Sequence, residues 1–323
     1  NAIASPSGVL LRVSSSWTFS GNSFYQTASR SLATNSIQFN GINITSTCTN
    51  NFQITDNYLG GTAPKAAGGI LTFTGSGQFL GFSTSVAGAT ATITGNKVMN
   101  INFTSDGATS NFRPIGIFAG TVNCTNDTIS NIQLSLNGVT LPFASMIQSG
   151  TGGLIHGAIN ISNNVIKDVS LTSTTSPGLR AISFQGNPTV GYTVNNNFID
   201  NFSSSANIGV IGIFASSGTG TCSILNNVIS NLSQTGTLTG GGSYGIFTNS
   251  TSGISFTIQK NTLTNIASSS TYTTDPVASG IIVYSSGTTN NLDSNTISNI
   301  QATYNASSIA IGASGITTTN ASA

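Results

Sequence analysis

The most unusual property of this 323-residue sequence is how little charge it carries. Lys, Arg and Asp together make up 5% of the residues, Glu is absent, and the formal net charge is +1. A typical soluble domain has roughly 25% charged residues. The few basic residues are scattered, so the sequence predicts no nucleic-acid-binding surface. Because little charge repulsion separates copies of such a chain, self-association is favoured.

Residues that bind metals or perform covalent catalysis are also scarce. The sequence has one His, His156, and three Cys, and they form no recognisable metal-binding spacing. We therefore predict no metal and no cofactor, and place His156 on the surface or in a turn. Cys48, Cys124 and Cys222 are expected to be small buried hydrophobes that form no disulfide. No apolar run reaches the roughly 18 residues that a membrane span needs.

What the sequence does contain is a repeat. The segment from Thr257 to Ile266 (TIQKNTLTNI) has related copies along most of the chain. The first positions of eight copies run from residue 54 to residue 292, and the seven intervals between them average 34 residues. A fixed period of roughly 20–50 residues indicates a solenoid, a propeller or an array.

Each copy predicts a strand, a sharp corner and a second strand. Apolar and small polar residues alternate before the central Asn, as at Phe256 and Ile258, and again after it, as at Leu263. A third apolar segment, of the type Gly245-Ile246-Phe247, precedes most copies, and no helical stripe with capping residues separates them. We therefore predict an all-β, right-handed, single-stranded parallel β-helix (β-solenoid) with three short strands per coil and about eight or nine coils.

Asn recurs at two fixed positions in this repeat. If coils stack at about 4.8 Å, equivalent side chains lie above one another and each amide can donate a hydrogen bond to the next. Asn also suits a corner because it tolerates left-handed backbone angles. The first predicted ladder is Asn57, Asn96, Asp127, Asn164, Asn197, Asn227, Asn261 and Asn295. The second, four residues further on, is Asn100, Asn131, Asp168, Asn201, Asn231, Asn265 and Asn299.

The repeated phrase Asn-Asn-x-Ile-x-Asn-Ile resembles the parallel β-helix repeat of the pectate-lyase-like superfamily. The Ser/Thr/Asn/Gly-rich phrasing, with Gly-Ile-Phe between copies, is similar to repetitive secreted surface proteins of Bacteroidota, often exported by type IX secretion. This resemblance covers about residues 36–316 and implies the β-helix fold and an extracellular or cell-surface location. It does not specify a function.

The two ends of the chain depart from the repeat. Residues 1–35 hold the single Trp and are expected to form a cap or a contact with another domain or subunit, because an open first coil exposes a strand edge. Trp17, Phe19, Phe24 and Tyr25 are the residues predicted to make that contact. Residues 36–316 are the predicted β-helix, and residues 317–323 a C-terminal tail after which the chain is expected to continue.

Catalysis is not predicted. The resemblance implies that an enzyme of this superfamily would place several acids, and a Lys or Arg base, on the outer surface of one sheet. Asp168 and Asp200 lie in neighbouring coils beside Lys167, but no third acid is near, and one carboxylate is expected to turn toward the corner. We assign these residues structural or solvated roles, with no catalytic residues.

Two functions, from different classes, fit this sequence. The first is a non-enzymatic extracellular structural or adhesive β-solenoid, a filament or cell-surface fibre subunit that assembles head to tail; its expected partners are other copies and surface glycans. The alternative is a carbohydrate-binding or carbohydrate-active β-helix, resembling polysaccharide lyases and hydrolases. Most aromatic residues have inward parity, with Tyr272 and Tyr304 as exceptions, and this favours the first function. Ice binding is disfavoured because the outward column is mixed: Gln53, Thr92, Asn123, Asn160, Thr193, Ser223, Thr257 and Asn291.

Overall fold

The structure of this chain is a computed structural model. The residues it describes are 7–11, 16–34, 37–46, 51–108, 110–137, 143–150, 155–173, 178–185, 187–188, 191–206, 208–216, 220–236, 242–250, 254–269, 277–285, 289–303 and 313–319.

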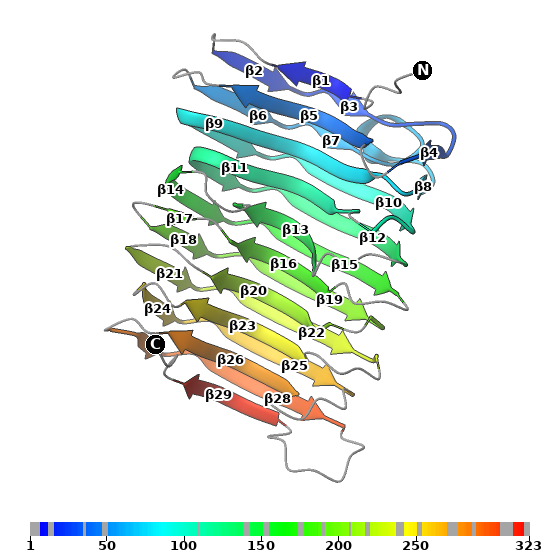
Figure 1. The fold of residues 1–323 in the computed structure, drawn as a ribbon. Helices are drawn as coiled ribbons and strands as arrows, with labels where there is room; N and C mark the ends of the chain where they lie inside the picture. The colour runs from blue at the N-terminus through cyan, green and yellow to red at the C-terminus, as the bar shows by residue number, and fades with distance from the viewer. Residues whose placement is uncertain are drawn as a thin grey trace.

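Nearly all of the regular structure is β-strand, and strands of successive coils pair in parallel (Figure 1). The first sheet contains β1 (Ser7–Leu11), β2 (Trp17–Ser20), β5 (Gln38–Ser46), β6 (Phe52–Thr55), β9 (Gln78–Thr94), β11 (Phe112–Thr125), β13 (Phe143–Ser149), β14 (Ile155–Ser162), β16 (Gly178–Phe184), β17 (Asn187–Pro188), β18 (Tyr192–Asn195), β20 (Val210–Ser216), β21 (Thr221–Leu225), β23 (Ser243–Ser250), β24 (Ser255–Gln259), β26 (Ala278–Ser285), β27 (Asn291–Asp293) and β29 (Ala313–Thr319). The second sheet contains β3 (Ser23–Phe24), β4 (Arg30–Leu32), β7 (Tyr58–Leu59), β8 (Leu71–Gly75), β10 (Lys97–Ser105), β12 (Thr128–Leu136), β15 (Val165–Thr172), β19 (Phe198–Ser204), β22 (Val228–Gln234), β25 (Thr262–Ser268) and β28 (Thr296–Ala302). A 3₁₀ helix, η1 (Pro64–Ala66), interrupts the coil that holds β7.

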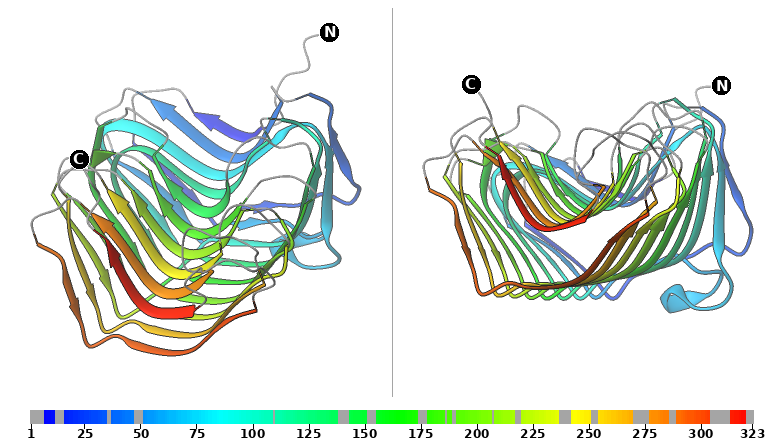
Figure 2. Two further views of the ribbon diagram at one scale, coloured as in Figure 1. Left: turned by 60° about the horizontal axis from the view of Figure 1, so that its bottom comes forward. Right: turned by 90° about the horizontal axis from the view of Figure 1, so that it is seen from below.

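The predicted parallel β-solenoid is confirmed. A regular coil has three strands, such as β20, β21 and β22, and each pairs with its equivalent in the next coil, β23, β24 and β25. In two coils, the first and second strands are joined into one long strand, which is β9 in one coil and β11 in the next. The register between β9 and β11 shifts near Gly120. Viewed along its axis, the molecule has a curved cross-section, and β29 lines the inner side of the curve (Figure 2).

Apolar side chains form columns along the axis between the two sheets. In one column, each residue pairs with its equivalent in the next coil, and the residues between the two ends of the column are fully buried. The members of the column are Val9, Ile42, Phe82, Ile115, Ile147, Ile182, Ile213, Ile246, Ile281 and Ile316. Burying such a side chain contributes about 1.5–3 kcal/mol. Each coil alone exposes its columns at both edges, so stability depends on neighbouring coils.

The predicted Asn ladders are present, and the first one is buried inside the corner. Asn227 is representative: its Oδ1 accepts hydrogen bonds from the backbone N (3.0 Å) and the Nδ2 (2.9 Å) of Asn197. Its own Nδ2 donates to the carbonyl of Val194 (3.0 Å) and to the Oδ1 of Asn261 (2.9 Å). Every amide hydrogen and the carbonyl oxygen are therefore used, as buried polar groups require. Asn22, which the sequence analysis missed, donates to Asn57 and adds a coil to the ladder.

The corner itself is made by a different residue from the one predicted. The ladder Asn does not have a left-handed backbone; the residue before it does, with φ between 53° and 69° from residue 56 to residue 294. These residues are Asp56, Gly95, Asn126, Asn163, Asn196, Asn226, Lys260 and Ser294. This explains the Asn-Asn pairs of the repeat: the first Asn tolerates the left-handed backbone, and the second binds the neighbouring coils.

The described strands of the N-terminal segment stack on the first coil of the repeat. β1, β2 and β3 pair in parallel with β5, β6 and β7, so they form a coil. Trp17 is 46% exposed and stacks on Phe19, with ring centroids 6.2 Å apart, and Tyr25 is 39% exposed. Phe24 packs against the core and lies edge-on to Phe82. At the other end, β29 reaches Thr319, beyond the predicted start of the tail.

A second apolar cluster lies outside the main core, on the opposite face of β20, β23 and β26. It contains Phe214, Tyr244, Phe247 and Tyr284, and adjacent rings are 5.4–5.6 Å apart at their centroids. The Arg180 guanidinium carbon lies 3.5 Å from the centroid of the Phe214 ring. These outward rings were not predicted, whereas Tyr272 and Tyr304, which were, lie outside the described residues.

Replacing Asn227 with Ala should destabilise the protein by roughly 2–4 kcal/mol, because four buried hydrogen-bonding groups around it lose a partner. Chemical denaturation followed by circular dichroism would measure this. The control is Asn231→Gly in the same coil, which keeps a left-handed backbone and removes only an exposed amide, and we expect a loss under about 1 kcal/mol. Equal losses of stability in the two variants would contradict the conclusion that the buried first ladder stabilises the protein more than the exposed second ladder does.

Replacing Lys260 with Asn should stabilise the protein by about 0.5–1 kcal/mol, because Asn adopts the left-handed backbone at lower cost. The matched control is Lys97→Asn, which is also exposed and adjacent to a ladder Asn but lies in strand β10. There we expect no gain. The difference in melting temperature between the two variants is the measurement, and a stabilised Lys97→Asn would rule out the backbone explanation.

Candidate functional site

The second ladder lies on the outer surface of the second sheet, in contrast to the first. Its members sit within strands but have φ between 53° and 57°, so each bends its strand. From Asp168 onward the side chains are exposed to solvent. Asn131 donates to Asn100 (2.7 Å) and Asn265 donates to Asn231 (2.9 Å), so the bonds point toward the preceding coil, opposite to the first ladder.

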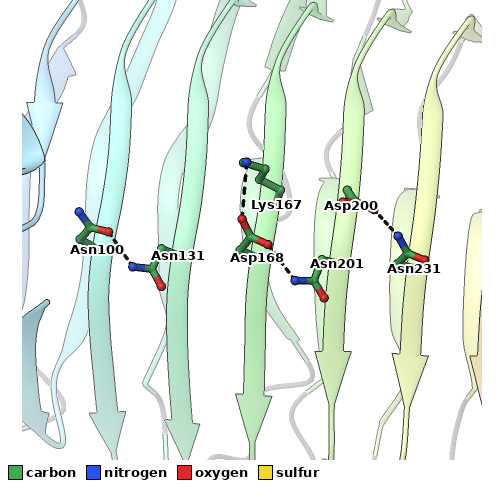
Figure 3. A network of polar contacts seen from close by, with 7 residues as sticks. All are labelled: Asn100, Asn131, Lys167, Asp168, Asp200, Asn201 and Asn231. Atoms are coloured by element: carbon green, nitrogen blue, oxygen red, sulfur yellow. Dashed lines mark hydrogen bonds and ion pairs between the residues drawn. The ribbon is translucent and has the colours of Figure 1, made fainter.

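The charged residues of the sequence analysis meet on this surface (Figure 3). Lys167 Nζ lies 3.7 Å from Asp168 Oδ2, and both side chains are 45% exposed. Asn201 donates to Asp168 Oδ1 at 2.8 Å. In the next coil, Asn231 donates at 2.7 Å to Asp200 Oδ1 rather than to its ladder neighbour. Each Asp is thus held by amides of the ladder.

The expectation that one of the two carboxylates turns into the corner is wrong. Both face outward, because the ladder position of Asp168 lies on the outside of the bend. Beside Asp168 is a shallow hollow of about 160 Å³, lined also by Asn131, Gln133, Asn201 and Ser203. An exposed ion pair of this kind contributes little to stability, about 0–1 kcal/mol. The hollow offers a polar ligand the carboxylate of Asp168 and the side-chain amides of Asn131, Gln133 and Asn201, and Asp200 lies in the next coil.

The first ladder contains one group that does titrate unusually, Asp127. Its Oδ1 accepts hydrogen bonds from the N (2.7 Å) and Nδ2 (2.9 Å) of Asn96, and its Oδ2 accepts one from the Cys124 thiol at 3.3 Å. Burial raises the pKa of Asp127 to about 7, although the bonds from Asn96 act in the opposite direction. In the other coils, the ladder residue has an amide group that donates hydrogen bonds. Ionised Asp127 has only an acceptor oxygen at that place, so protonation restores a donor.

The remaining candidate residues lie apart from one another. Cys124 and Cys222 are buried free thiols in different coils, as predicted, and burial raises both pKa values, so they stay protonated. The Cys124 hydrogen bond to Asp127 was missed; a Cys three residues before the exceptional Asp was the available signal. The backbone of His156 lies in strand β14, paired with Gly120, and not in a turn. Cys48 lies outside the described residues.

Within the described part of the chain, no group of three or more His, Cys, Asp and Glu side chains is placed to hold a metal ion. No helix there has the length and apolar character that a membrane crossing requires. Comparison with models of protein families, with curated proteins and with solved structures finds no match to this chain. The fold is established by the strand pairing, and the likeness to a particular family stays a prediction from the repeat.

Asp127 should make the stability of the protein depend on pH. Between pH 4 and pH 7 the folded state holds a proton that the unfolded state has lost, so the free energy of unfolding should fall as the pH rises, by about 4 kcal/mol in all. Asp127→Asn supplies the missing amide, and we expect it to remove this dependence and to be more stable than the wild type at pH 8. Denaturation series at pH 4 to 8 measure both.

The control for this experiment is Asp293→Asn, which changes an exposed carboxylate beside the far end of the same ladder, away from Asp127. It should leave the pH profile unchanged. A wild-type stability that does not fall between pH 4 and pH 7, or an Asp127→Asn variant no more stable than the wild type at pH 8, would contradict the raised pKa of Asp127.

Proposed function

We propose that this chain is a non-enzymatic structural β-solenoid of the cell surface, which assembles head to tail into filaments. The observation that carries the proposal is that the first and the last described strand of one stack, β1 and β29, each pair on one side. Among the described strands, β1 pairs only with β5, and β29 pairs only with β26. An open strand edge beside an exposed core is a template for another chain.

The strands at the two ends present apolar residues that can pack against each other. The axial column of apolar residues begins at Val9 in β1 and ends at Ile316 in β29, which is 49% exposed. A second copy that places its β1 against β29 would continue this column and the parallel pairing. Half-buried apolar residues flank it at both ends: Leu11, Phe19 and Phe24 at one, and Leu292, Ile297 and Ile300 at the other. Such a contact is heterologous, so it repeats without closing.

Surface chemistry supports the structural role. The net charge of +1 and the 5% of charged residues give copies little mutual repulsion. The carboxylates of Asp168 and Asp200 are held by ladder amides. The location at the cell surface follows from the resemblance of the repeat to secreted surface proteins, and surface glycans are the proposed partners of the filament.

End-to-end assembly is tested with variants that block one edge each. Assemblies of the wild-type protein should grow longer as its concentration rises, which sedimentation velocity measures. Negative-stain images should show filaments. Ile316→Lys and Val9→Lys should each stay monomeric, because a desolvated ammonium has no partner in the joint. An equimolar mixture of the two should stop at dimers, since one intact edge of each kind remains.

The matched control is Val228→Lys, because Val228 is 37% exposed but lies on the flank of the solenoid in β22. This variant should assemble like the wild type. A wild-type protein that stays monomeric at high concentration would contradict the proposal. The proposal would also be contradicted if Val228→Lys alone abolished assembly, because the contact would then lie on the flank of the solenoid.

A further inference from the structure

The outer face of the strands that precede the first ladder carries a hollow of about 190 Å³. It spans β11, β14, β18 and β21, on the opposite side of the ladder corner from Lys167 and Asp168. One water molecule needs only about 10–15 Å³ of such space, so the hollow has room for several waters or for one pyranose ring. Its rim is formed by Thr121, Asn123, Asn160, Thr193, Thr221 and Ser223.

The hollow is a local departure from an otherwise regular face. Outside it, the same column carries hydroxyl side chains, with Thr90 paired to Thr121 and Thr221 paired to Ser255. Between these pairs, β14 has one extra residue opposite Thr121, which is a β-bulge. Ala158 and Gly191 lie in the floor, so two small residues replace the hydroxyl side chains in successive coils.

The backbone geometry requires glycine at this place. A Cβ on Gly191 would lie 2.3 Å from the carbonyl oxygen of Thr221, and the φ of Gly191 is +97°. A Cβ on Gly157, within the bulge, would lie 2.2 Å from Thr121 Oγ1. A larger residue at Gly191 would push the coils apart, and one at Gly157 would displace the Thr121 side chain. The depression is therefore built into the backbone and does not depend on the rotamer of one side chain.

The polar groups around the hollow are available to a ligand. Asn123, Asn160, Thr193 and Ser223 follow one another in register, one per coil. None of the six rim side chains donates or accepts a hydrogen bond within the described part of the chain, whereas a buried amide of the first ladder such as Asn227 is fully used. The rim offers amide donors, amide acceptors and hydroxyl groups, and no rim residue is charged.

We propose that this hollow binds a neutral pyranose unit of a glycan. Sugar hydroxyl groups both donate and accept, and amide and hydroxyl side chains spaced one coil apart match such a ring. An acidic sugar lacks a cationic partner in the rim, so it is disfavoured. No rim residue is aromatic, so ring stacking does not add to the affinity, and a single site should bind weakly, in the millimolar range. The site does not depend on end-to-end assembly.

The test is a titration of the full chain with glucose, galactose, mannose and N-acetylglucosamine, followed by the side-chain amide signals of Asn123 and Asn160 in NMR spectra. At least one neutral sugar should shift these signals at millimolar concentration. Galacturonate, at the same concentration, should not. Asn160→Ala should weaken binding about tenfold, as the loss of paired hydrogen bonds predicts, and Ala158→Phe, which fills the hollow, should abolish it.

The matched control is Asn291→Ala, because Asn291 belongs to the same outward column but lies coils away from the hollow. It should bind like the wild type. If no neutral sugar shifts the amide signals, or if Asn160→Ala and Ala158→Phe bind as well as Asn291→Ala, the proposal is wrong. The Ile316→Lys variant, which blocks assembly, should bind sugar normally, so the failure of either proposal can be recognised separately.

Discussion

The stacking of this protein depends on one hydrogen-bonding arrangement, in which the Oδ1 of a buried Asn accepts two N–H groups from the coil before it. The arrangement fixes the position and orientation of the corner in every coil, because the same amide must also donate to the next Oδ1 and to a backbone carbonyl. Successive coils therefore align to within hydrogen-bonding distance. The apolar columns can then pack one residue above another without register errors.

This constraint explains which positions of the repeat vary. The residue before the ladder Asn needs only a left-handed backbone, so Asn, Asp, Gly, Lys and Ser all occur there at different energetic cost. The ladder position itself changes once, to Asp127, and there burial raises the pKa of the carboxyl until it is protonated near neutral pH. Protonated Asp127 can donate a hydrogen bond, as the amide does at this position in the other coils.

The outer surfaces follow different rules from the corner, and the proposed functions lie there. The second ladder is solvent-exposed, so its bonds can be redirected, as Asn231 shows by donating to Asp200 instead of to Asn201. On the outer face before the first ladder, a β-bulge with two glycines leaves a hollow, and its polar rim side chains form no hydrogen bond among the described residues. In a repeat, the regular coils serve as an internal reference, and a departure from them marks the place to look for a specific contact.

The sequence by itself determined the fold class, the three-strand coil, the composition of the first ladder and the outward column from Gln53 to Asn291. These depend on period and alternation, which a linear pattern contains in full. Only the tertiary structure decided that β1, β2 and β3 form a coil, that the residue before each first-ladder residue bends the backbone, and that the second ladder faces solvent. It alone placed Asp168 and Asp200 on one surface, Cys124 against Asp127, and the aromatic residues of β20, β23 and β26 outside the core. The physical reason is that these features depend on backbone angles and on contacts between coils about 30 residues apart in sequence, whereas alternation fixes only which residues share a face.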